Sequence, residues 1–75
     1  MDPLLPASVP LNLASVLLGR SREKVRALIR AGSLSTVTVG RREQVPLNVI
    51  EQKIGMQVTP TLYLYAERQL DRGRV

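Results

Sequence analysis

Apolar residues at helical spacing mark the first element of the chain. Leu11, Ala14 and Leu18 follow an i, i+3, i+7 pattern, which predicts a helix from about Leu11 to Leu18. Pro10 suits the start of this helix, because its missing N–H would be unpaired there. Gly19 suits the end, because glycine enters the left-handed region without steric penalty.

A second short helix is predicted directly after this turn. Ser21 is placed to cap its first N–H groups, and Glu23 stands in the first turn, where the helix dipole favours an acid. The helix should run to about Ala31, with Gly32 ending it. Its apolar stripe consists of Val25, Leu28 and Ile29.

The two helices and their short connection are typical of a helix-turn-helix over roughly residues 10 to 32. An ordinary pair of antiparallel helices in a small bundle is the alternative. Arg22, Arg26 and Arg30 favour the first interpretation, because their i, i+4, i+8 spacing puts one sign of charge beside the apolar stripe.

A β-hairpin is predicted next. Residues 36–39, Thr-Val-Thr-Val, are β-branched throughout, with valines on one face and threonines on the other. Gly40 and Arg41 suit a tight turn, and residues 42–45 suit a return strand with Val45 on the inner face. The tip would carry Gly40, Arg41 and Arg42. Because an isolated two-stranded hairpin is marginally stable, we expect it to pack on the helices.

Two apolar segments follow the hairpin. A third helix is predicted from about Leu47 to Ile54, with Asn48 as its candidate cap and Gly55 at its end. Residues 62–70 fit a helix better than a strand, although leucines and tyrosines alternate at its start. One side of that helix would hold Leu62, Tyr65, Ala66 and Leu70.

The 75 residues fit one domain of mainly α structure with a small β-hairpin, a winged helix-turn-helix. We expect residues 1–9 to form an irregular arm and residues 10–55 to form the domain. Residues 56–75 would serve packing or oligomerisation, with residues 71–75 as a frayed tail.

Positive charge is concentrated in one part of the chain. The net charge is +5, but the window from Arg20 to Arg42 holds seven basic residues and one acid, a net +6. A clustered positive field is expected of a nucleic-acid binder, whereas a solvated face that serves solubility is the alternative.

The residue types argue against several other classes. Cysteine and histidine are absent, so disulfides, thiolate metal sites and the usual general base are missing. No nucleophile–base pair or phosphate-binding loop is visible, and we expect neither an enzyme nor a cofactor. No apolar run reaches the roughly 20 residues that span a bilayer, and we expect a cytoplasmic protein of a bacterium or a phage-infected host cell.

The ordered set of these features resembles a known family. Val9-Pro10-Leu11, Leu17-Leu18-Gly19, Leu28-Ile29, Val39-Gly40-Arg41 and Val45-Pro46 stand in an order similar to the excisionase-like branch of the winged-helix superfamily, related to MerR-type DNA-binding domains. The resemblance covers about residues 9–54. It implies that the second helix enters the major groove of DNA and that the hairpin, as a wing, meets the minor groove or the backbone.

The expected DNA-binding residues lie on the second helix and the wing. Arg26 suits a guanine, because arginine can bond O6 and N7 together, and Glu23 suits a cytosine N4 or, alternatively, only complements the helix dipole. Arg41 suits a narrow minor groove. Arg42 would act there too or bind the backbone. The remaining candidates, expected at phosphates, are Ser21, Arg22, Lys24 and Arg30; for Lys24 and Arg30 plain solvated charge is the alternative.

Three functions fit these features. The resemblance implies a phage or mobile-element excisionase that directs an integrase, with possible repressor activity. A stand-alone transcriptional regulator would use the same surface. A protein-interaction module whose basic face meets an acidic partner is the third. We expect self-association on DNA, with Leu62, Tyr65 and Leu70 as the candidate contact; the alternative is that these side chains cover the core of their own chain.

Overall fold

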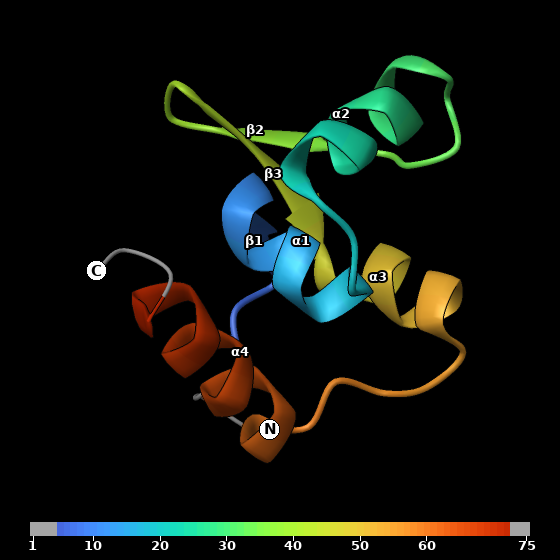
Figure 1. Ribbon diagram of the computed structural model, residues 1–75. Helices are drawn as coiled ribbons and strands as arrows, with labels where there is room; N and C mark the ends of the chain where they lie inside the picture. The colour runs from blue at the N-terminus through green and yellow to red at the C-terminus, as the bar shows by residue number, and fades with distance from the viewer. Residues whose placement is uncertain (1–4, 73–75) are drawn as a thin grey trace.

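The computed structural model describes residues 5–72, which form four helices and a three-stranded antiparallel sheet (Figure 1). In chain order the elements are β1 (Ser8–Pro10), α1 (Leu11–Leu18), α2 (Arg22–Arg30), β2 (Val37–Val39), β3 (Arg42–Pro46), α3 (Leu47–Ile54) and α4 (Pro60–Arg72). The expected mainly helical structure with a hairpin is confirmed. In Figure 1, α1 lies between α2 and α4, and it contacts all three other helices.

The turn between α1 and α2 forms as the glycine and serine signals predict. Gly19 has a φ of 68°, and the N–H groups of Gly19 and Arg20 donate to the carbonyls of Val16 (3.1 Å) and Ser15 (3.0 Å). This pair of bonds satisfies carbonyls that the end of α1 would otherwise leave free. Three residues therefore separate the two helices, and the predicted bounds of both are confirmed.

The prediction of an irregular arm over residues 1–9 is wrong for residues 8 and 9. With Pro10 they form β1, an edge strand in which Val9 pairs with Val45 of β3. The strand ends at Pro10, which an edge position tolerates because no ladder bond is required there. Residues 1–4 of the expected arm lie outside the described residues.

The β2–β3 hairpin has the predicted two-residue turn. Val39 pairs with Arg42, and Gly40 has a φ of 64°. No non-glycine residue between 5 and 72 has a positive φ, so within this turn only Gly40 has one, as a type II′ turn requires at its first central residue. The register puts Val45 on the threonine face of β2. Val37 therefore lies on the opposite face, where it is exposed.

Two local expectations for α3 and α4 need correction. Asn48 does not cap α3, because Pro46 occupies the N-cap position and the prolyl ring offers no acceptor. The helix α4 is longer than expected at both ends. Thr59 caps it by accepting the N–H of Leu62 (3.1 Å), and Pro60 occupies its first turn. Residues 71 and 72 are helical rather than part of a tail, and residues 73–75 lie outside the described part of the chain.

The helix α4 packs on α1, but with a different tyrosine from the expected one. Ala66 is fully buried, and Leu62, Tyr63 and Leu70 pack against the core. Tyr65 is 57% exposed and so does not belong to the packed side. Of the three side chains expected at an oligomer interface, two therefore cover the core of their own chain.

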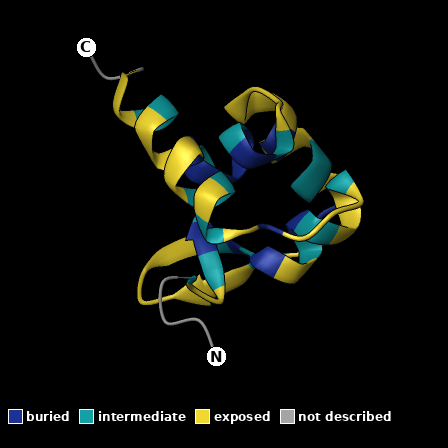
Figure 2. Cartoon of the chain, turned by 90° about the horizontal axis from the view of Figure 1, so that it is seen from below, coloured by how far each residue is buried: buried dark blue, intermediate teal, exposed yellow. Residues whose placement is uncertain are grey.

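Each helix contributes to one core. Figure 2 shows buried residues on the inner sides of the elements and exposed residues on their outer sides. The largest fully buried side chains are Val9, Val25, Val45 and Ile50. Because α2 supplies only Val25 to the buried set, most of its surface faces solvent.

Candidate nucleic-acid interface

The exposed surface of α2 is the starting point for a binding site. Leu28 and Ile29 are half-buried beside Val25, and helical spacing points Glu23 and Arg30 away from this apolar stripe. Every side chain expected to touch DNA is exposed, namely Ser21, Arg22, Glu23, Lys24, Arg26, Arg30, Arg41 and Arg42. Exposure leaves all eight free to meet a macromolecular surface.

One side of α2 faces the hairpin across a shallow hollow. Arg22 and Arg26 line it from α2, and Arg42 and Glu43 line it from β3. Arg42 pairs with Val39 as the first residue of β3, so it is not part of the turn at the hairpin tip. The structure thus brings three arginines from two elements to one place.

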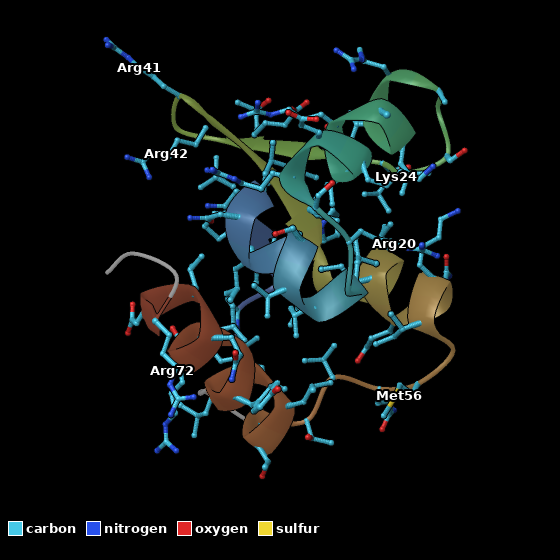
Figure 3. All side chains as sticks on the ribbon, in the orientation of Figure 1. Arg20, Lys24, Arg41, Arg42, Met56 and Arg72 are labelled. Carbon is cyan, nitrogen blue, oxygen red and sulfur yellow. The ribbon has the colours of Figure 1, made fainter. Side chains whose placement is uncertain are left out.

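Arg41 is separate from this group. It occupies the second position of the turn, and Figure 3 shows its side chain extending beyond the hairpin tip, away from the helices. A cation held at the end of a two-stranded arm can reach a surface that α2 does not touch.

Lys24 lies on the other side of α2. Figure 3 shows Lys24 and Arg20 on the side of α3, opposite to Arg41 and Arg42. Ser21 accepts the backbone N–H of Lys24 (3.2 Å), so the serine is a helix cap and this N–H is not free for a phosphate. Lys53, which the sequence did not single out, lines a hollow together with Arg20 and Lys24.

One acidic residue on the hairpin side of the site, Glu43, was not predicted from the sequence. Glu43 lines the hollows that hold Arg22, Arg26 and Arg30, and its carboxylate accepts a hydrogen bond from the Thr36 hydroxyl (3.0 Å). The alternation of side chains along a strand could have indicated Glu43, because a residue two positions before the buried Val45 lies on the same face of β3. The carboxylate offsets part of the positive charge between α2 and the hairpin.

Another hollow lies between α4, the start of α1 and Arg42 of β3. Its volume is about 460 Å³, and its charged lining residues are Arg42, Glu67, Arg68 and Asp71. Both signs of charge are present, so this hollow does not concentrate anions as the α2 surface does. Burial, with the nearby charge of Glu67, raises the pKa of the Tyr63 phenol at its edge above the ordinary value.

Within residues 5–72, no group of three or more histidine, cysteine, aspartate or glutamate side chains is arranged to hold a metal ion. Over the same residues, no helix combines the length and the apolar character needed to cross a membrane.

The chain was compared with models of protein families, with curated proteins and with solved structures, and none of them matches it.

Proposed function

We propose that this protein binds double-stranded DNA in a sequence-specific manner as a winged helix-turn-helix, with α2 in the major groove and the β2–β3 hairpin as the wing. The observation that carries the proposal is the grouping of Arg22 and Arg26 of α2 with Arg42 of the hairpin, next to the projecting Arg41. The major groove of duplex DNA admits an α-helix, and flanking cations neutralise the phosphates beside it.

The proposed contacts follow from the position of each side chain. Arg26 and Glu23 lie one turn apart on the exposed side of α2, where they reach base edges. Arg22 and Arg42 bind phosphates on the hairpin side. Arg41 enters the minor groove, whose negative potential attracts arginine when the groove is narrow.

The biological role that we propose is excision of a phage or mobile element, with an integrase as partner and repression as a second activity. The resemblance to excisionase-like proteins supports this role. A transcriptional regulator would use the same residues. Footprinting on the DNA that flanks the gene of this protein separates the two, because repeated sites at an attachment site favour excision and one promoter operator favours regulation.

Two arginine substitutions test whether Arg26 reads a base while Arg41 binds DNA with little regard to sequence. Arg26→Ala should weaken binding to the specific site by about 1–3 kcal/mol and relax the preference at one base pair. Arg41→Ala should weaken specific and random duplexes more evenly, because it reads little sequence. Equal losses on both DNAs for Arg26→Ala would show that Arg26 contacts phosphate only. Binding of an acidic polypeptide in place of DNA would support a protein-interaction module instead.

A further inference from the structure

A basic hollow lies on the side of α2 that faces α3, away from the hairpin. Its rim carries Arg20 from the turn before α2, Lys24 from α2 and Lys53 from the last turn of α3. Its floor consists of the half-buried side chains Leu18, Leu28 and Ile54. Among residues 5–72, no acidic residue lines this hollow, in contrast to the hairpin side, where Glu43 is present.

We propose that this hollow binds a backbone phosphate of the DNA strand that flanks α2 on the side opposite to the hairpin. The inference rests on the proposed function. A helix in the major groove, which is about 12 Å wide, has a sugar–phosphate backbone on each side. The hairpin side has Arg22 and Arg42, whereas the α3 side has the three cations of the hollow.

The composition of the hollow selects an anion. Walls of low dielectric constant focus the field of charges of one sign, and here an apolar floor lies beneath three cations. The volume of about 200 Å³ is below the roughly 300–1,000 Å³ of small-molecule pockets, so an exposed anionic group fits it better than an enclosed ligand.

Lys53 is the residue that distinguishes this site from the rest of the interface. It belongs to α3, outside the helix and hairpin to which the DNA contacts are otherwise assigned. Its role is to hold the second strand, and it reads no base. Lys53 therefore contributes to affinity for specific and random duplexes alike.

The test compares Lys53→Gln with Arg68→Gln in the full-length protein. Arg68 is an exposed cation of α4 and lines a different hollow, so it controls for the loss of one positive charge. Affinity for a specific and a random duplex is measured over a range of salt concentrations. Lys53→Gln should weaken both complexes about fivefold at roughly 0.15 M salt and make the slope of log K against log salt shallower by about 0.9. Arg68→Gln should change neither quantity.

The outcomes separate this inference from the proposed function. Wild-type protein without salt-dependent binding to DNA would overturn the proposed function itself. Wild-type binding that Lys53→Gln leaves unchanged, or equal losses in the two variants, would overturn the phosphate site alone. Unchanged DNA binding together with lost binding of polyglutamate would assign the hollow to an acidic protein partner. Ethylation interference should lose one phosphate signal in Lys53→Gln, on the strand opposite to the hairpin.

Discussion

Deletion of residues 56–75 should unfold the protein, because α4 and the segment before it complete the core. Val58 is 3% exposed, and Leu62, Tyr63 and Leu70 are half-buried against the core. Full burial of one such side chain stabilises a fold by about 1.5–3 kcal/mol, so these four contribute together about 5 kcal/mol. A domain of 75 residues has a total stability of only about 4–11 kcal/mol.

The expected result is a loss of the cooperative thermal transition or a decrease in Tm of about 20–40 °C, as measured by circular dichroism. Tyr65→Ala is the matched control. Because Tyr65 is 57% exposed, its truncation should change stability by no more than about 0.5 kcal/mol. A deletion variant that melts cooperatively within a few degrees of the full chain would refute the assignment of α4 to the core and would return this segment to a role in assembly.

Three further experiments test the local chemistry. Ser21→Ala removes the cap of α2 and should cost about 1 kcal/mol of unfolding free energy, measured by urea denaturation; no change would mean that the 3.2 Å bond contributes nothing. Glu43→Gln removes the acid among the interface arginines and should strengthen binding to random duplex DNA, and weaker binding would argue that Glu43 positions them instead. In a Tyr65→Phe background, an absorbance titration should give Tyr63 a pKa above 10.0, and Glu67→Gln should lower it. Because the pKa of Tyr63 is raised in the folded state, the associated stability is present below pH 10 and is lost as the pH rises through the folded-state pKa. Loss of stability that begins at a lower pH would contradict the raised pKa.

Local signals predicted most of the helical framework. The α1–α2 turn and the hairpin follow from residues that act within a few positions of themselves, namely Gly19, Ser21 and Gly40. Each sets a backbone conformation or a cap that does not depend on distant parts of the chain. The helical spacing of the arginines beside the apolar stripe placed them correctly at the surface of α2.

Features that depend on contacts between distant segments were missed. The strand β1 forms because residues 8–10 pair with β3. A strand of three residues is too short for an alternating pattern to predict it from the sequence. Lys53 comes near Arg20 and Lys24 because α2 and α3 both pack on α1, and this arrangement depends on contacts between distant segments. The packed side of α4 was assigned to Tyr65 instead of Tyr63, because Tyr65 stands three positions after Leu62, a spacing typical of an apolar helix side, whereas the packing on α1 brings Tyr63 to the core.

The reading of base sequence by α2 is tested most directly by the affinity of the full-length protein for two duplexes, one selected from a random pool and one with its sequence scrambled, between about 50 and 200 mM salt. We predict at least about a thousandfold preference for the selected duplex and a slope of log K against log salt of roughly −4 to −5, since about five cations meet phosphates. Equal affinity for the two duplexes, with a slope near zero, would contradict DNA recognition by α2 and the hairpin.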